Sequence, residues 1–231
     1  GSGYPVVRLV SLMALRGRIA LNCALAGCRT SETTLAKQLL GAIPGDSLSI
    51  MDRYYHNYTV WHTLSGGGKN RHWLTRGRDD LRVWKTIKRH APGDELAEIT
   101  IRPETRRRNP ELPETLRVRI IRYRRAGFKT RTLITSLLDP TLYPAKEIAG
   151  LYHERWEMEL AYDEIKSHAL ENEVVLRSQS PDRVKQEIYG LLIGYNLVRR
   201  EMEGMAKACN LPANRISFQA TLLMMRDLFY W

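Results

Sequence analysis

The chain has 231 residues, of which 43% are hydrophobic and 26% charged, so it can bury a sizeable core and has the composition of an ordinary globular protein. Its 36 lysines and arginines outnumber 25 aspartates and glutamates, which gives a formal net charge of +11. This balance favours a polyanionic partner, most commonly nucleic acid. No apolar run reaches the ~20 residues that a bilayer-spanning helix needs, so we expect no membrane association.

The start of the chain and the cysteines bear on its compartment. The first ten residues lack the charged segment and the long apolar segment of a secretory signal. Cys23, Cys28 and Cys209 have no metal-ligand spacing, and we expect buried free thiols in a reducing cytoplasm.

The first third of the chain alternates between strand-like and helix-like patterns. Two apolar runs flank a turn at Gly17 and predict a hairpin. The expected elements are strands at 8–15 and 18–27, a helix at 31–43, a strand at 48–51, a helix at 57–64 and a strand at 71–76. This order is typical of an α/β sheet with helices packed on its faces.

The middle of the chain has a different character. Between about 78 and 132, runs rich in β-branched residues are separated by a segment with three prolines, and we expect an inserted antiparallel β unit. A buried strand follows at 131–139. The remainder is expected to be helical, with one helix at 144–170 and another at 181–205.

Most of the basic excess lies in one segment. Between residues 102 and 131 there are eleven lysines or arginines and three glutamates, a net charge of +8. The basic residues are Arg102, Arg106, Arg107, Arg108, Arg117, Arg119, Arg122, Arg124, Arg125, Lys129 and Arg131. A solvated charged face would explain the run, but its concentration on one β unit favours contact with a phosphate backbone.

The helix expected at 144–170 carries four polar residues at regular spacing. On a continuous helix, Tyr152, Arg155, Glu159 and Lys166 would fall within an arc of about 60°, directly beside an apolar stripe. Such a wall suits a phosphate-rich substrate, because a carboxylate can hold a divalent metal while two cations neutralise phosphate oxygens. The simpler alternative is a salt bridge of Glu159 with its helical neighbours.

A single carboxylate does not make a magnesium site, since hard cations take several oxygen ligands. In an α/β sheet, a second carboxylate is expected where a buried strand ends in the cleft. Asp52, which closes the strand at 48–51, is the candidate. It could instead cap the helical segment that follows it.

These residues resemble a known family. The pattern Tyr152-x2-Arg155-x3-Glu159-x6-Lys166 resembles the tyrosine-arginine-glutamate-lysine signature of the insertion-sequence-four family of DDE transposases. The segment IMDRYYHN around Asp52 resembles that family's second-aspartate motif. With the run that precedes it, the resemblance covers about residues 4–80 and 130–175.

The resemblance implies an α/β RNase H-like core that lacks its first strand, with a β-rich insertion and C-terminal helices. The implied divisions are 1–77 and 133–175 for the core, 78–132 for the insertion, and 176–231 for the helical region. Asp52 and Glu159 would be catalytic residues that hold Mg²⁺ in a two-metal site, and Tyr152, Arg155 and Lys166 would bind DNA.

The implied activity is transposition. The enzyme would cut double-stranded DNA at transposon ends and transfer the strands to target DNA, as a homodimer on paired ends, in the bacterial cytoplasm at the nucleoid. Asp46, the one aspartate before Asp52, lies in a turn, so the first aspartate of the triad is not in this sequence. We therefore expect these residues alone to be inactive. A non-catalytic DNA-binding relic and another RNase H-like nuclease are the alternatives.

Overall fold

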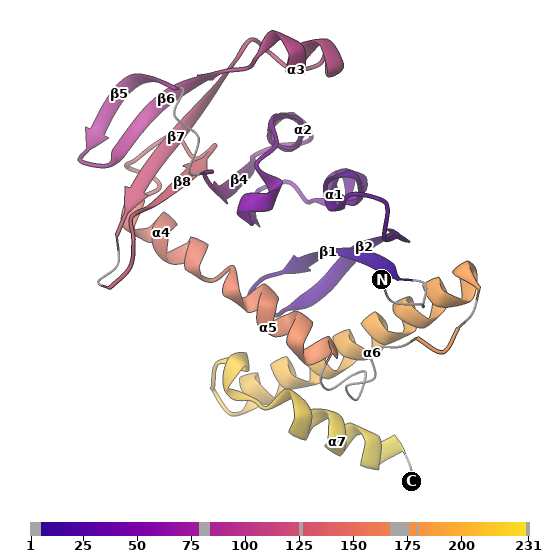
Figure 1. Cartoon of the computed structure of the whole chain (residues 1–231). Helices are drawn as coiled ribbons and strands as arrows, with labels where there is room; N and C mark the ends of the chain where they lie inside the picture. The colour runs from indigo at the N-terminus through magenta and orange to yellow at the C-terminus, as the bar shows by residue number, and fades with distance from the viewer. Residues whose placement is uncertain (1–5, 79–83, 125–126, 167–175, 179, 230–231) are drawn as a thin grey trace. The chain divides into compact units, whose positions relative to one another are not determined.

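The computed structural model describes residues 6–78, 84–124, 127–166, 176–178 and 180–229. The described part is a mixed α/β structure, as the sequence predicts, with one two-stranded sheet and one six-stranded sheet (Figure 1). The chain divides into two units. One is formed by Gly1–Leu35 with Trp156–Trp231, and the other by Ala36–Arg155.

The contiguous unit is built on the six-stranded sheet, in the order β3-β4-β8-β7-β6-β5. The strands are β3 (Ser47–Met51), β4 (Arg71–Arg76), β5 (Lys85–Ala91), β6 (Asp94–Thr100), β7 (Thr115–Tyr123) and β8 (Arg131–Thr135). The pair β3 and β4 is parallel, and every other neighbouring pair is antiparallel. The segment from 78 to 132 therefore pairs antiparallel as expected, and it extends the same sheet through β8.

Helices cover both faces of this sheet. Helix α2 (Tyr58–Gly66) begins after Asn57, whose side chain accepts from the amides of Thr59 and Val60, and it lays Trp61 against Trp73. Helix α4 (Ala145–His153) instead packs in a core that includes Leu74. Because neighbouring strand residues point to opposite faces, α2 and α4 cover opposite faces of the sheet.

Short helical segments precede and follow β3, and one further short helix is unexpected. The segments are η1 (Leu40–Ala42) and η2 (Arg53–Tyr55), and the short helix is α3 (Pro103–Arg108). Helix α3 lies in the proline-containing segment that was expected only as a separator. Pro103 at its first position suits a helix start.

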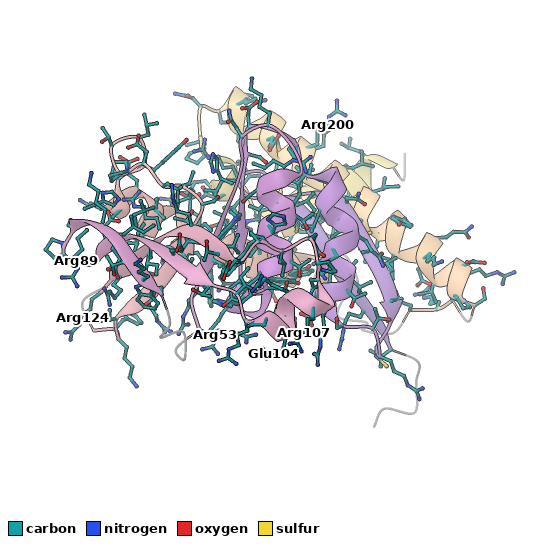
Figure 2. The ribbon with its side chains drawn as sticks, turned by 90° about the horizontal axis from the view of Figure 1, so that it is seen from above. Arg53, Arg89, Glu104, Arg107, Arg124 and Arg200 are labelled. Carbon is teal, nitrogen blue, oxygen red and sulfur yellow. The ribbon has the colours of Figure 1, made fainter. Side chains whose placement is uncertain are left out.

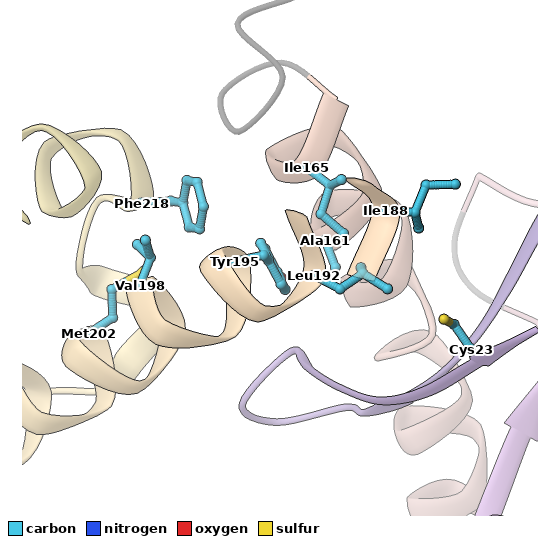
Figure 3. Packing of buried hydrophobic residues seen from close by; sticks show 9 residues of the cluster. All are labelled: Cys23, Ala161, Ile165, Ile188, Leu192, Tyr195, Val198, Met202 and Phe218. Atoms are coloured by element: carbon cyan, nitrogen blue, oxygen red, sulfur yellow. The ribbon is translucent and has the colours of Figure 1, made fainter. Parts of the chain in front are cut away.

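The other unit joins a hairpin to helices. Strands β1 (Val7–Ala14) and β2 (Ile19–Gly27) pair antiparallel around the expected turn at Gly17. The helices are α1 (Glu32–Leu39), which continues into the contiguous unit, α5 (Trp156–Glu164), α6 (Pro181–Ala208) and α7 (Phe218–Phe229). The core gathers side chains from β2, α5, α6 and α7, including Cys23, Ala161, Leu192 and Phe218 (Figure 3).

The expected single helix at 144–170 is wrong. Helix α4 ends at His153 and α5 begins at Trp156, while the last residues of the expected helix, 167–170, lie outside the described part. The amide of Arg155 bonds to the carbonyl of Tyr152, three residues back, in the turn between the helices. Tyr152 belongs to the core of one unit and Ala161 to that of the other, so the two helices are held by different cores. The 60° arc therefore does not apply across this turn.

The cysteine prediction is partly wrong. Cys23 is buried in β2, but Cys28 and Cys209 are exposed because they follow the ends of β2 and α6 in turns. All three are free thiols. Within the described residues, no helix is both long and apolar enough to span a membrane.

Candidate active site

Asp52 lies directly after β3 and is fixed by two neighbouring contacts. Its Oδ1 accepts a hydrogen bond from the amide of Tyr54 at 3.3 Å, so it is the N-cap of η2. The buried hydroxyl of Thr75 on β4 donates to the carbonyl oxygen of Asp52 at 3.1 Å. The carboxylate remains 52% exposed. Asp52 therefore caps η2 as the alternative interpretation predicts, and it uses only Oδ1 to do so.

Arg155 and Tyr152 join Asp52 at this end of the sheet. The Nη1 of Arg155 lies 3.4 Å from the Oδ2 of Asp52. Tyr152 is 9% exposed and packs against Leu74 and Ile121. Three of the five residues predicted for the site are therefore brought together in one unit.

Two further residues belong to this cluster, and sequence reasoning missed both. Tyr123 packs against the same core as Tyr152, and the positive charge of Arg76 lowers the pKa of the Tyr152 hydroxyl. Arg76 is the last residue of β4. It comes directly after Thr75, which pairs with Met51 of β3, just as Asp52 comes directly after Met51. The sequence could have indicated Arg76, because it ends the predicted strand at 71–76 that follows the strand ending at Asp52. Asp52, Arg76, Tyr123, Tyr152 and Arg155 are called the Asp52 cluster below.

The Tyr152 hydroxyl is held neutral. Burial raises the pKa of Tyr152 to about 12, the positive charges of Arg155 and Arg76 lower it, and the carboxylate of Asp52 raises it. A neutral phenol can donate a hydrogen bond to an anionic oxygen without adding negative charge to the site. Tyr152 is thus a donor at any pH near neutrality.

This pKa predicts a pH effect on stability. Between pH 10 and 12 an unfolded Tyr152 ionises while the folded one stays protonated, so stability that is present below pH 10 is lost, by about 2 kcal/mol. Urea unfolding of the wild type and Tyr152→Phe should show a smaller loss across this range in the variant. A phenolate absorbance step near pH 12 should also disappear. Equal losses in both proteins would contradict the assignment.

Glu159 and Lys166, the other two predicted residues, belong to the discontiguous unit. Glu159 lies in the first turn of α5, and Lys166 follows the end of the helix. Both residues are exposed. Seven residues separate them, which is about two helical turns, so they share one face. The structure therefore keeps the spacing of this pair while assigning the pair to a different unit from Asp52.

The metal-binding prediction can be compared with the donors present. Asp52 and Glu159 both offer exposed carboxylates, the oxygen ligands that Mg²⁺ takes. Across the described residues, no group of three or more histidines, cysteines, aspartates or glutamates lies close enough to hold a metal ion. The carboxylates of Asp52 and Glu159 are of the ligand type that Mg²⁺ takes, but these two residues supply only part of the ligands that the ion needs.

The basic segment is less uniform than its sequence suggests. Arg119 is fully buried and paired with Asp94, and Arg122 pairs with the buried Glu95. Arg125 lies outside the described residues. Exposed members remain on α3 and after β7, where Figure 2 shows Arg107 and Arg124 at the surface. Strand β5 adds three exposed cations that were not in the predicted set, Lys85, Lys88 and Arg89, and Figure 2 shows Arg89 at the surface.

Comparison with known proteins shows the family of the chain. The model of the family described as "Transposase DDE domain" matches residues 1–197. The chain is 34% identical over 204 residues to "Transposase InsG for insertion sequence element IS4" of Escherichia coli strain K12, a match that covers 88% of this chain and 46% of that protein. It is 36% identical over 152 residues to "Putative transposase InsZ" of the same strain, across 64% of this chain and 46% of the relative.

The chain thus spans about half the length of the curated relatives that it matches. The matched region includes the Asp52 cluster, α5 and α6 as far as Leu197. The chain belongs to the DDE transposase family, of the insertion-sequence-four type, and its α/β architecture is the RNase H-like fold of that family.

Proposed function

We propose that this chain is part of an insertion-sequence transposase that cuts double-stranded DNA at transposon ends and transfers the strands to target DNA. The observation that carries the proposal is the Asp52 cluster, in which the strand-end carboxylate lies 3.4 Å from Arg155, Arg76 ends the neighbouring strand, and the charges of both arginines act on the neutral Tyr152. Two cations against one carboxylate give this cluster a positive balance. Such a balance suits a bound phosphate.

The residues of the cluster divide the work of holding a DNA strand. Arg155, and with it Arg76, would neutralise oxygens of a phosphate near the scissile bond, since arginine presents several N–H donors in a fixed plane. Tyr152 would donate its hydroxyl to a phosphate oxygen, and its raised pKa keeps that proton in place. Lys166 would supply a further phosphate contact from beside α5.

Asp52 and Glu159 would hold Mg²⁺ through their carboxylates. When bound, the metal would supply Lewis-acid stabilisation to the attacking and leaving oxygens of the displacement. Arg155 lies within 3.4 Å of Asp52, so it would keep this carboxylate turned toward the site while the amide of Tyr54 fixes its other oxygen.

The remaining partners follow from the same proposal. The exposed cations of β5, α3 and β7 would contact the DNA backbone outside the reacting strand. The protein would act as a homodimer on paired DNA ends, at the nucleoid in the bacterial cytoplasm. Residues 1–77 and 133–175 would form the catalytic core, 78–132 the insertion and 176–231 the helical region.

The proposal is tested by DNA affinity. Binding of the chain to a short duplex should fall about five- to tenfold at 0.1 M salt in Arg155→Gln, and the slope of log K against log salt should fall by about 0.9, as for one lost phosphate contact. Fluorescence anisotropy at several salt concentrations measures both. Lys146→Gln is the matched control, because Lys146 is exposed on the first turn of α4, the helix that ends just before Arg155.

Equal affinity and slope in the Arg155 variant and the wild type would contradict the phosphate role of the Asp52 cluster. A loss of the same size in the Lys146 control would show that the charge of the surface, and not the cluster, sets the affinity. A duplex of unrelated sequence should give the same change, since a phosphate contact carries no base information.

A further inference from the structure

Arg18, in the turn between β1 and β2, occupies an unusual backbone conformation. Its φ is +52°, in the left-handed region that favours glycine and asparagine. Holding another residue there costs about 1 kcal/mol or more. The neighbouring Gly17 could adopt such a conformation without this cost. An arginine in this place therefore indicates that its side chain is needed.

The side chain of Arg18 forms a fork across two turns of α5. Its Nε and Nη2 lie 2.7 Å and 2.6 Å from Oε2 of Glu157, and its Nη1 lies 2.5 Å from Oε1 of Glu164. Glu157 and Glu164 are seven residues apart, so they lie one above the other on the same face of the helix. The Arg18 side chain is only 10% exposed.

A second arginine completes the arrangement from α6. Arg199 is 1% exposed, and its Nη1 lies 3.3 Å from Oε1 of Glu164, while its Nε donates to the carbonyl of Gly17 at 3.0 Å. The hydroxyl of Tyr195 donates to Oε2 of Glu164 at 3.0 Å. The two arginines and two glutamates, Arg18, Arg199, Glu157 and Glu164, balance in charge and are called the arginine clamp below.

The clamp fixes the rotation of α5 about its own axis. At about 100° per residue, Ala161 lies on the clamped side with Glu157, whereas Glu159 falls roughly opposite, about 200° away. Ala161 and Ile165 pack in the same core as Ile188 and Leu192 of α6 (Figure 3). Lys166 is two residues beyond Glu164 and is exposed with Glu159. The clamped side and the exposed pair therefore lie on opposite sides of α5.

We propose that Arg18 is a positioning residue, which holds α5 at one rotation and so presents Glu159 and Lys166 together on the exposed face. The inference rests on the proposed function for the importance of that face. Buried ion pairs often add no more stability than apolar side chains of similar size. The three contacts of the Arg18 guanidinium, two with Glu157 and one with Glu164, specify one arrangement of the helix, which a metal ligand and a phosphate contact require.

The first test is hydrogen exchange in the chain with Arg18→Gln. Amides of α5 should exchange about tenfold faster, while those of α6 around 188–202 should keep their protection. Arg16→Gln is the matched control, since Arg16 is an exposed arginine in the same turn. Arg18→Lys should give an intermediate rate of exchange, because the lysine ammonium can reach only one of the two carboxylates. This variant replaces Arg18→Gln in the test if the glutamine variant does not fold. Unchanged α5 exchange in both Arg18 variants would overturn the inference.

The second test is a double-mutant cycle on binding of a short DNA duplex. Lys166→Gln should lower the salt slope by about 0.9 in the wild type and by less than about a third of that in the Arg18→Gln background. Lys185→Gln, an exposed lysine near the start of α6, should show equal effects in both backgrounds. Equal effects of Lys166→Gln in both would overturn the positioning role. If Lys166→Gln has no effect in the wild type, its phosphate role fails, and the exchange experiment alone decides whether Arg18 fixes α5.

Discussion

Replacing Asp94 with alanine is expected to lower the free energy of unfolding by about 3–5 kcal/mol, because it leaves the guanidinium of Arg119 buried without its carboxylate. Arg119 has no exposed surface, and its Nε and Nη2 lie 2.7 Å and 2.6 Å from the two oxygens of Asp94. Urea unfolding followed by tryptophan fluorescence measures the loss. The pair also bears on the site, because Nη1 of Arg119 donates to the carbonyl of Tyr143 at 2.6 Å, just before α4 begins.

The control for this experiment is Lys88→Ala on the neighbouring strand β5. Lys88 is exposed, and its loss should change stability by less than about 0.5 kcal/mol. An Asp94→Ala loss below about 1 kcal/mol would show that the Arg119 guanidinium finds other partners or water. Helix α4 carries Tyr152, whose pKa is raised mainly by burial. If Asp94→Ala loosens the start of this helix, Tyr152 becomes more exposed and its pKa should fall.

Truncating Trp61 to alanine is expected to cost about 3–5 kcal/mol as well, for a different reason. Trp61 is fully buried, and its ring is stacked on Trp73 with centroids 4.5 Å apart and planes at 11°. Removing it leaves a large cavity between α2 and the sheet and removes the ring contact. Differential scanning calorimetry with urea unfolding would measure the effect.

Trp61→Phe should recover more than half of the loss, since a phenyl ring fills most of the space. Trp156→Ala is the control, because Trp156 is 56% exposed at the start of α5 and should change stability little. A small effect of Trp61→Ala would contradict this prediction and would mean that α2 shifts toward β4 to fill the space left by the Trp61 side chain. Thr75, which bonds Asp52, lies on β4 two residues after Trp73, the residue stacked on Trp61, so DNA affinity is a second readout for the Trp61 variant.

The sequence was most informative where a pattern is local. The strand at 48–51 ends on Asp52 because an apolar run is followed by a carboxylate and turn-forming aromatics, and the structure has β3 at Ser47–Met51 with Asp52 next. Tyr152 and Arg155 likewise lie close together as their spacing predicts, because three residues span less than one helical turn. The hairpin at Gly17 and the long helix α6 also follow from local patterns.

Other features depend on partners far along the chain, and no local pattern indicates them. Strand β5 reads KTIKRHA, with a single large apolar residue, so it has no alternation to detect, and it forms because β6 offers an edge. Arg119 looked like one more surface cation, yet its partner Asp94 is 25 residues away. The break before Trp156 follows from the two helices belonging to different cores.

The division of the chain also has a consequence for synthesis on the ribosome. Residues 36–155 form a contiguous unit, which can fold as soon as it emerges, whereas the other unit needs residues 1–35 together with residues 156–231. Arg18 must find Glu157 across 139 residues, and Gly17 must find Arg199 across 182. At about 5–20 residues per second, the hairpin is made roughly 6–26 s before α5 begins to be made. During that interval the residues of α5, α6 and α7 that pack against β1 and β2 are not yet made, so we expect chaperones to bind this hairpin in the nascent chain.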